Sequence, residues 1–236
     1  MSILVIATRN QHKVGEIQAI LGDQFHYVTL NEFEKVPEVI ENAGTFTGNA
    51  TKKAVELAKW LCGIRNAEHG KGNEGKWVLA DDSGLEVDAL DGAPGVNSAR
   101  FAALDTGQQG NSSTAENNAK LLRMLRDVPL GKRTARFRCV LALTPVLERS
   151  GENASPVCTA DEFELNTQVF EGVCEGRIVF EPRGNCGFGY DPLFMPLGYD
   201  QTFGELSQEL KNSLSHRGKA LGLLRTALMK EAGRNY

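Results

Sequence analysis

One segment near the start of the sequence combines side chains that suit phosphate binding. Residues 8–13 follow a short apolar run and precede a helical pattern. The N-terminus of a helix presents free backbone N–H groups and the positive end of the helix dipole, which together bind phosphate. Thr8 and Asn10 add polar side chains, and Lys13 adds a charge. The segment indicates a phosphate site, but an ordinary Asn10 cap and a solvated Lys13 would give the same pattern. It lacks the glycine spacing of a P-loop.

Two adjacent carboxylates, Asp81 and Asp82, follow the apolar run Trp77–Ala80. Like charges this close raise a pKa or recruit a cation. Mg²⁺ takes carboxylate oxygen, water and substrate phosphate. Glu41 is a candidate third carboxylate if the fold brings it near. The alternative is an acidic turn at the end of the strand, in which an aspartate caps and Gly84 supplies an unusual φ.

The segment Phe188-Gly189-Tyr190-Asp191 indicates a planar ligand. Glycines beside an aromatic residue let such a ligand approach the backbone. Phe188 can stack on a base, and Asp191 can hold a base edge or orient a lysine. The alternative is a tight turn with Phe188 and Tyr190 in the core.

A basic pair, His216 and Arg217, follows Ser215 at the start of a predicted helix. Ser215 can cap this helix, which places both cations in its first turn. Cations are unfavourable at that end of the helix dipole. The pair is therefore better explained by an anionic or acceptor-rich ligand, with a solvated basic turn as the alternative.

The apolar spacing predicts the elements that carry these residues. We expect strands at 3–7, 25–30, 77–80, 134–147, 163–173 and 178–180, helices at 14–21, 50–62, 113–128 and 216–231, and polar loops at 63–76 and 151–161. Asn49 and Lys53 lie one helical turn apart and can face a phosphate tail together, although exposed helix lysines are common. Strands and helices alternate first and strands then cluster, which predicts an α/β fold with a mixed sheet.

The composition excludes several classes of protein. A net charge of −4 argues against a general DNA or RNA binder, which is usually basic. The 236 residues fit one large domain or two small lobes that share a core. The five cysteines form no C-x-x-C pair and indicate reduced thiols rather than a zinc site. Neither a signal peptide nor a membrane span is recognisable, so we expect a soluble cytoplasmic protein.

Six segments occur in a fixed order along almost the whole chain. They are T-x-N-x-x-K at 8–13, residues 41–46 with Asn49 and Lys53, D-D-S-G-L at 81–85, A-P-G-V at 93–96, F-G-Y-D-P at 188–192 and S-H-R-G at 215–218. Together they resemble the inosine triphosphate pyrophosphatase family, the non-canonical purine nucleoside triphosphate pyrophosphatases. The resemblance implies an elongated central mixed β-sheet flanked by helices. It implies one catalytic domain over residues 1–236, with two lobes around an active-site cleft, and a homodimer.

The same resemblance implies an activity and a set of roles. The activity is Mg²⁺-dependent hydrolysis of ITP, dITP and XTP to the monophosphate and pyrophosphate, which cleanses the nucleotide pool. Asp82 would be the proton acceptor and a metal ligand, with Glu41 and Asp81 also at the metal. The residues assigned to substrate binding are Thr8, Arg9, Asn10, Gln11, His12, Lys13, Asn49, Lys53, Ser83, Phe188, Gly189, Tyr190, Asp191, Lys211, His216 and Arg217. The chain departs from the family at Arg9, where glycine is usual, and at Asn97, where an aromatic residue is common.

Base choice and three alternative functions follow from these assignments. His216 and Arg217 are candidate donors to the 6-keto oxygen of inosine and xanthine, whereas adenine would present an amino donor there. How guanine is rejected does not follow from the sequence. The alternatives are a pyrophosphatase for pyrimidine or modified nucleotides, a nucleotide sensor that does not hydrolyse, and a Mg²⁺ phosphatase that releases orthophosphate.

Overall fold

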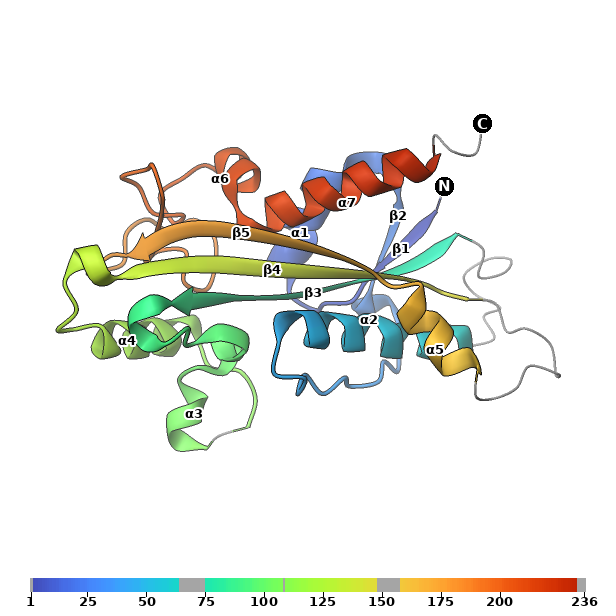
Figure 1. Cartoon of the computed structure of the whole chain (residues 1–236), viewed down its shortest axis with the longest axis horizontal. Coiled ribbons are helices and arrows are strands. Elements are labelled where there is room, and N and C mark those ends of the chain that lie inside the picture. The colour runs from blue at the N-terminus through green and yellow to red at the C-terminus, as the bar shows by residue number, and fades with distance from the viewer. Residues whose placement is uncertain (1, 64–74, 108, 148–157, 233–236) are drawn as a thin grey trace. The chain divides into compact units, whose positions relative to one another are not determined.

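The computed structural model describes residues 2–63, 75–107, 109–147 and 158–232. The chain forms two compact units. Unit 1 contains Met1–Asp82, Val140–Phe170 and Leu224–Tyr236, and unit 2 contains Ser83–Cys139 and Glu171–Leu223. The strands are β1 Ile3–Ile6, β2 His26–Thr29, β3 Lys76–Val87, β4 Thr134–Pro145, β5 Gln168–Ile178 and β6 Phe194–Pro196 (Figure 1). The helices are α1 Gln11–Leu21, α2 Phe46–Gly63, α3 Ala103–Thr106, α4 Thr114–Met124, α5 Cys158–Leu165, α6 Gln208–Leu214 and α7 His216–Ala232.

The six strands form one mixed sheet, as the alternation of elements predicted. Their order is β2-β1-β3-β4-β5-β6. β1 runs parallel to both β2 and β3, whereas β5 and β6 are antiparallel. The boundary between the two units falls within β3, between Asp82 and Ser83.

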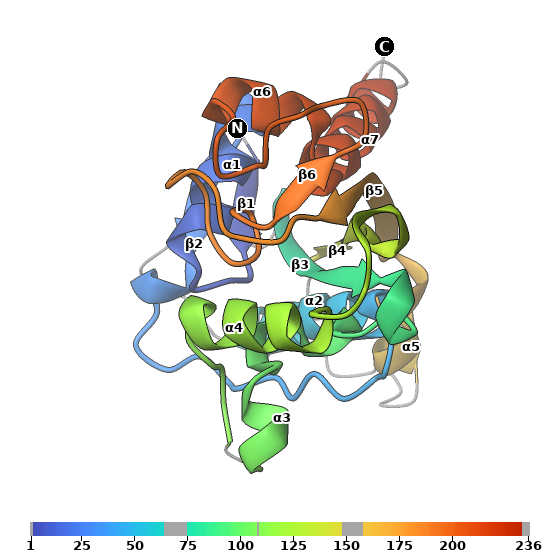
Figure 2. The ribbon, with the colours of Figure 1, turned by 90° about the vertical axis from the view of Figure 1, so that its left-hand side faces the viewer.

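In unit 1, two crossovers place helices on both faces of the sheet. β1 connects through α1 to β2 on one side, and β2 connects through α2 back to β3 on the other. Right-handed crossovers in opposite directions put their helices on opposite faces, and α1 and α2 lie on opposite faces here (Figures 1 and 2). Ile17 of α1 and Leu57 of α2 are almost fully buried, as is Leu79 of β3.

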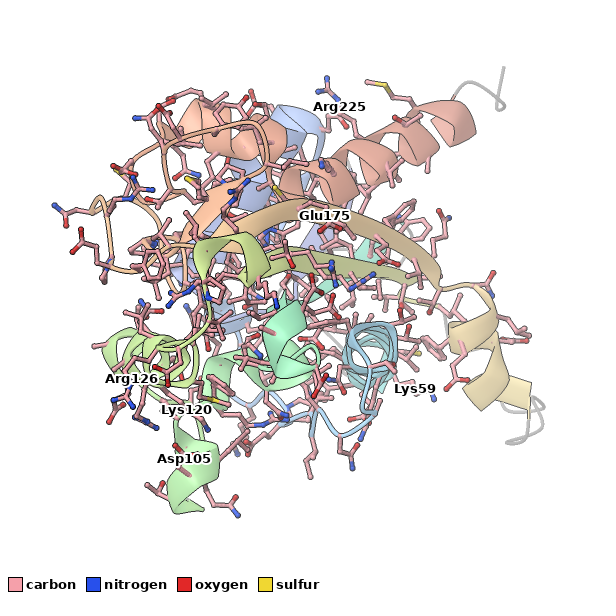
Figure 3. The ribbon with its side chains drawn as sticks, turned by 60° about the vertical axis from the view of Figure 1, so that its left-hand side comes forward. Lys59, Asp105, Lys120, Arg126, Glu175 and Arg225 are labelled. Carbon is pink, nitrogen blue, oxygen red and sulfur yellow. The ribbon has the colours of Figure 1, made fainter. Side chains whose placement is uncertain are left out.

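In unit 2, aromatic side chains fill the core. Phe137 of β4 stacks on Phe203 at 6.0 Å and on His216 at 4.7 Å, each with an interplanar angle of 12°. The ring centres of Phe194 in β6 and Phe137 lie 4.7 Å apart. Leu121 of α4 closes the core from the other face, where Figures 1 and 2 show this helix opposite α6 and the start of α7. Charged side chains such as those of Arg126 and Glu175 remain exposed on the surface of this unit (Figure 3).

Several predicted elements differ from those observed. The apolar run 77–80 does not end in an acidic turn, because β3 continues through the carboxylates to Val87. The strand predicted at 163–173 begins as α5 and becomes β5 only at Gln168, so apolar content alone misassigned its first part. Residues 158–161 of the predicted loop are helical, while 64–74 and 151–157 lie outside the described residues.

Other differences concern shorter elements. The strand predicted at 178–180 is absent, because Ile178 is the last residue of β5. Helix α4 ends at Met124 rather than at 128. The sequence pattern did not indicate α3, α6 or β6, which are all shorter than eight residues. Such elements carry too few apolar positions to show a period.

A glycine in β5 lets the start of α7 pack against the sheet. A Cβ added at Gly172 would overlap the His216 carbonyl oxygen and lie 2.6 Å from the Ala220 nitrogen. We expect Gly172→Ala to lower the free energy of unfolding by about 1–3 kcal/mol, the usual cost of overpacking. Gly222→Ala in α7 is the matched control, because its Cβ would meet nothing within 4 Å. Its free energy of unfolding should instead rise by about 0.5–1 kcal/mol, because alanine has a higher helix propensity than glycine. Urea unfolding followed by circular dichroism measures both, and equal effects would contradict the packing argument.

Candidate functional site

The strand order places the segment after β1 beside the carboxylates of β3. Ile6, the last residue of β1, pairs with Leu79, and the Ala7 N–H donates to the Leu79 carbonyl at 2.8 Å. Because β2 and β3 flank β1, the strand order reverses at β1. Ligands of open α/β sheets bind outside the carboxyl ends of strands at such a point. Within unit 1, residues 8–13 and Asp81 therefore belong to one edge of the sheet.

The start of α1 is capped as the simpler interpretation of Asn10 supposed. The Asn10 side chain accepts from the backbone N–H groups of His12 at 3.0 Å and Lys13 at 3.3 Å. Thr8 Oγ1 accepts from the Asn10 N–H at 3.2 Å. Lys13 is not a solvated lysine, because its ammonium group pairs with the Asp81 carboxylate. The side chains of Arg9, Gln11 and His12 belong to exposed residues.

Asp81 and Asp82 lie inside a continuous strand, and both are buried, at 2% and 6% exposure. Successive side chains of a strand point to opposite faces. Asp81 meets Lys13 of α1, while Asp82 Oδ2 accepts from the amide of Asn49 in α2 at 3.0 Å. The two carboxylates therefore act as separate groups with separate partners, and the alternative of a capped acidic turn is wrong.

Burial raises the pKa of the Asp82 carboxyl to about 6. The Asn49 hydrogen bond and the charges of Lys13 and Lys53 oppose this shift, whereas the charge of Glu41 adds to it. A carboxylate with a pKa near neutrality can both hold and release a proton at physiological pH. Asp82 therefore has the acidity expected of a general base.

Asn49 and Lys53 of α2 hold the third carboxylate in the same unit. Asn49 is 1% exposed, and its Oδ1 accepts from the Ala43 N–H at 2.9 Å. Its amide also donates to Asp82, so a single side chain joins the segment of Glu41 to β3. Lys53 forms an ion pair with Glu41 and reaches the Asp81 carbonyl at 3.5 Å. Asn49 and Lys53 therefore lie on the same side of α2, and their joint contact with a phosphate tail stays a prediction.

In unit 2, a buried ion pair supports the aromatic segment. Asp191 and Lys211 are 3% and 2% exposed, and Lys211 Nζ lies 2.8 Å from Asp191 Oδ2. The same oxygen accepts from the Phe188 N–H at 2.7 Å. Lys211 Nζ lies 4.9 Å from the centre of the Phe188 ring, and the Arg217 guanidinium lies 5.8 Å from it. Asp191 thus orients a lysine, which is one of the two roles that its position suggested.

The start of α7 confirms the predicted cap and buries the basic pair. Ser215 Oγ accepts from the Gly218 N–H at 3.0 Å. Arg217 is 1% exposed and donates to Ser83 Oγ at 3.2 Å, and His216 is 5% exposed and stacks on Phe137. A solvated basic turn is therefore excluded for this segment.

The partners of some predicted residues carry no sequence signal. Tyr190 is buried, as the core interpretation supposed, and its hydroxyl donates to the Ser98 carbonyl at 2.9 Å. Asn118 of α4 donates to the Gly189 carbonyl at 3.1 Å. Asn97, which departs from the family pattern, accepts from Arg100 Nε at 3.0 Å. Contacts between positions as distant as 98 and 190 leave no periodicity that a single sequence could reveal.

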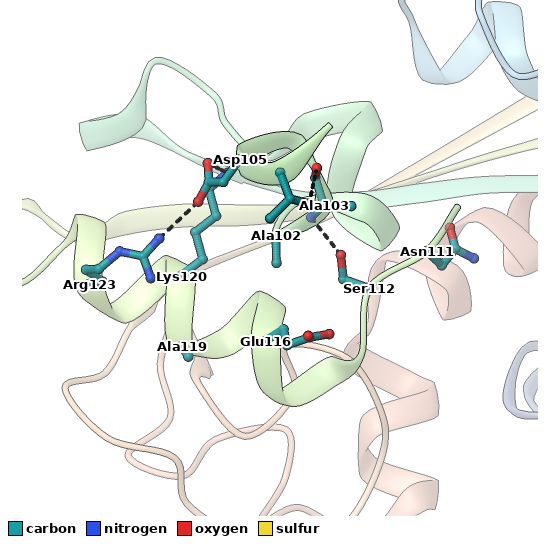
Figure 4. A pocket seen from close by; sticks show the side chains of 10 residues that line it. Ala102, Ala103, Asp105, Asn111, Ser112, Glu116, Ala119, Lys120 and Arg123 are labelled. Carbon is teal, nitrogen blue, oxygen red and sulfur yellow. Dashed lines mark hydrogen bonds and ion pairs between the residues drawn. The ribbon is translucent and has the colours of Figure 1, made fainter. Parts of the chain in front are cut away.

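A cavity of about 330 Å³ lies elsewhere in unit 2, between the region of α3 and α4. None of its lining residues belongs to the predicted site. Figure 4 shows Lys120 and Arg123 of α4 at Asp105 of α3, with ion-pair distances of 2.6 and 3.0 Å. The lining of the cavity therefore contains ion-paired side chains of both signs.

No three histidine, cysteine or acidic side chains among residues 2–63, 75–107, 109–147 and 158–232 cluster as a metal site. No helix of the described chain has the length and apolar content needed to cross a membrane.

An α/β sheet with a lysine and a helix N-terminus where the strand order reverses is typical of a class of nucleotide-binding proteins. The chain belongs to the Ham1 family, whose model matches residues 4–227. It is 47% identical over 219 residues to a dITP/XTP pyrophosphatase of Desulforamulus reducens, covering 92% of this chain and 91% of that protein. A dITP/XTP pyrophosphatase of Exiguobacterium sibiricum is 44% identical, covering 95% and 96%. The solved structure of a HAM1 protein from Coxiella burnetii matches with a TM-score of 0.74 and 36% identity, covering 98% of this chain and all of that one. The resemblance inferred from six segments is thereby confirmed.

The raised pKa of Asp82 makes a prediction about stability. The folded pKa is about 6 and the unfolded value 3.8, so the folded chain binds the proton more tightly. Ionisation then destabilises the fold progressively as the pH rises from about 4 to 6, by up to about 3 kcal/mol. Without divalent metal, Asp82→Asn should be more stable than the parent at pH 7.5, and this advantage should shrink toward pH 4.5. Urea midpoints in EDTA buffers measure it. Asp127→Asn at an exposed side chain is the control, and pH-independent differences for both variants would contradict the assignment.

Proposed function

We propose that this chain hydrolyses ITP, dITP and XTP to the nucleoside monophosphate and pyrophosphate in a Mg²⁺-dependent reaction. The observation that carries the proposal is the buried Asp82 carboxylate, with a pKa raised to about 6, among Asn49, Lys13, Lys53 and Glu41. The names of the relatives, dITP/XTP pyrophosphatases, support the substrate class. Residues 1–236 act as a single catalytic domain with two lobes.

Asp82 is the proposed proton acceptor. Its carboxylate takes a proton from a water molecule that attacks the phosphorus of the cleaved bond. Asn49 holds Asp82 Oδ2 at 3.0 Å, which fixes the carboxylate in one orientation and leaves Oδ1 for the water. Because only the ionised form accepts a proton, this role requires a pH above about 6 in the absence of metal.

The donor set of unit 1 fits Mg²⁺. In nucleotide sites this ion is held by one or two carboxylates together with substrate phosphates and water, so a cage of three protein ligands is not required. Asp82 and Glu41 are the proposed ligands, and Asp81 is a third candidate. Asp82 carries a carboxylate whose burial is costly while charged, and a cation relieves that cost. When bound, Mg²⁺ neutralises phosphate charge and the charge that develops on the leaving pyrophosphate.

Lys13 and Lys53 are the proposed phosphate ligands, together with residues 8–12 before and at the start of α1. Lys13 pairs with Asp81 and Lys53 pairs with Glu41. Triphosphate oxygens are strong acceptors for ammonium groups. We expect the substrate to draw both lysines from their carboxylates, which releases the carboxylates for the metal.

The base is proposed to stack on Phe188, beside two cationic donors. Lys211 and Arg217 both lie within 6 Å of the Phe188 ring centre and carry no acceptor. A 6-keto oxygen satisfies such donors, whereas the 6-amino group of adenine leaves them unpaired at a cost of about 1–3 kcal/mol each. The remaining proposed contacts are those of Ser83, Gly189, Tyr190, Asp191 and His216.

The setting of the enzyme is also a proposal. The resemblance implies a homodimer that works in the cytoplasm on small-molecule nucleoside triphosphates. The net charge of −4 supports the absence of a nucleic acid polymer as partner. We propose no membrane partner.

The first test measures products. With Mg²⁺ we expect pyrophosphate from ITP, dITP and XTP and little from ATP or GTP. Asp82→Asn should lower kcat by about 10²-fold or more, the usual weight of a general base. Direct release of orthophosphate would favour a phosphatase, and pyrophosphate from pyrimidine nucleotides would shift the substrate class. Nucleotide binding without any product would favour the alternative of a nucleotide sensor that does not hydrolyse.

The second test concerns base selectivity. Arg217→Met should lower kcat/KM for ITP by about ten- to hundredfold, the worth of a charged hydrogen bond, and lower that for ATP much less. Arg126→Met, at a side chain that is 81% exposed, is the control and should change neither value. An equal loss with both nucleotides would remove Arg217 from base recognition.

A further inference from the structure

The Phe188 loop, residues 187–191, is fixed by three hydrogen bonds, although its glycines allow its backbone many conformations. Gly187 and Gly189 have φ values of 78° and 62°, which favour glycine. A Cβ at Gly187 would also overlap the Asp191 carboxylate. Glycines on both sides of Phe188 give the unrestrained loop many conformations. A ring that must stack on a base therefore needs anchors outside the loop.

The first anchor lies within the loop and the other two come from distant parts of unit 2. The Phe188 N–H donates to Asp191 Oδ2 at 2.7 Å. Asn118 Nδ2 in α4 donates to the Gly189 carbonyl at 3.1 Å. The Tyr190 hydroxyl donates to the Ser98 carbonyl at 2.9 Å. Three successive residues of the loop are thus each fixed by a different hydrogen bond.

Ser98 connects this loop to β3. It lies in the 3-10 helix Gly95–Arg100, part of the A-P-G-V-N-S-A-R segment to which the sequence assigned no role. Its Oγ accepts from the Leu85 N–H at 2.9 Å and donates to the Gly95 carbonyl at 2.6 Å. Leu85 lies two residues after Ser83, the partner of Arg217. Ser98 therefore bonds both to the residue after Gly189 in the Phe188 loop and to the part of β3 that follows Ser83. Phe188 and Ser83 are both proposed base contacts.

We propose that Asn118 and Tyr190 are positioning residues that hold the Phe188 ring for purine stacking, Asn118 through the Gly189 carbonyl and Tyr190 through the Ser98 carbonyl. The inference rests on the proposed function, since it assigns Phe188 to the base. The Asn118 side chain does not need to touch the nucleotide. Tyr190 is 5% exposed, and its hydroxyl is engaged by Ser98.

The burial of Asn118 supports a role beyond stability. Asn118 is 9% exposed, and its Oδ1 has no hydrogen-bond partner among the described residues. A buried acceptor without a donor is destabilising, which offsets what the bond to Gly189 contributes. Truncation removes the unsatisfied oxygen together with the bond. Asn118→Ala should therefore change loop order more than it changes global stability.

Two residues of unit 1 provide matched controls. The Asn166 side-chain amide donates to the Glu162 carbonyl at 2.7 Å, as that of Asn118 donates to the Gly189 carbonyl. The Tyr27 hydroxyl likewise donates to a backbone carbonyl, that of Gly22 at 2.6 Å. Asn166→Ala and Tyr27→Phe thus repeat each change in chemistry outside the Phe188 loop and the segment that supports it.

The experiment measures kcat and KM for ITP and ATP, IMP affinity by calorimetry, and thermal midpoints. We expect Asn118→Ala and Tyr190→Phe to raise KM for ITP and weaken IMP binding by about three- to tenfold each, the worth of one hydrogen bond. kcat should change less, and the selectivity for ITP over ATP should fall. Effects in the double variant should be less than additive, because both bonds order one loop. The control variants should keep the parent selectivity.

The outcomes separate this proposal from the proposed function. Equal losses with ITP and ATP, or an equal fall in selectivity for Asn166→Ala, would mean that Asn118 only supports the fold and would overturn the proposal. If the parent binds IMP without hydrolysing ITP, the proposed reaction fails, but weaker IMP binding by Asn118→Ala still supports positioning. If the parent binds no purine nucleotide, both proposals fail.

Discussion

Unit 1 is organised around a carboxylate that lies inside a buried strand. An ionised group at the position of Asp82 loses hydration that the protein must replace. The replacement comes from the Asn49 amide of α2, with Lys13 and Lys53 as nearby charges. Because Asn49 also binds the backbone at Ala43, the segment that carries Glu41 depends on the same side chain. The Asp82 carboxylate is thus kept in place although its charged form costs the fold stability.

Unit 2 contains buried cations rather than buried carboxylates alone. Arg217 and Lys211 are among its least exposed charged residues, and each has a polar partner, Ser83 or Asp191. The loss of hydration and the helix dipole both disfavour a buried cation in the first turn of α7. The fold accepts this arrangement because Gly172 lets the helix start lie against β5 and Phe137 stacks on His216. The concentration of donors near Phe188 is therefore built into the packing of the unit.

The sequence anticipated the long elements and the residue types of the site. Regular apolar spacing predicted α1, α2 and α7, and the capping box at Ser113 predicted the start of α4, where both reciprocal hydrogen bonds form. The sequence-based prediction failed for elements whose structure depends on their length or on their tertiary contacts. The strand β3 continues past Asp81 because the polar side chains find partners in helices that are distant in sequence. The start of α5 was taken for a strand, since a short apolar run fits either structure.

The sequence alone determined which chemical groups are present, their order and the family to which the chain belongs. Local spacing is sufficient for caps, helix faces and motifs, because these depend on residues within a few positions of one another. Tertiary structure decided which groups act together. It directed Asp81 and Asp82 to different partners and joined Asn118 and Ser98 to a loop about 70 and 90 residues away. These pairings arise from sheet order and the packing of unit 2, which depend on the whole chain and leave no local pattern.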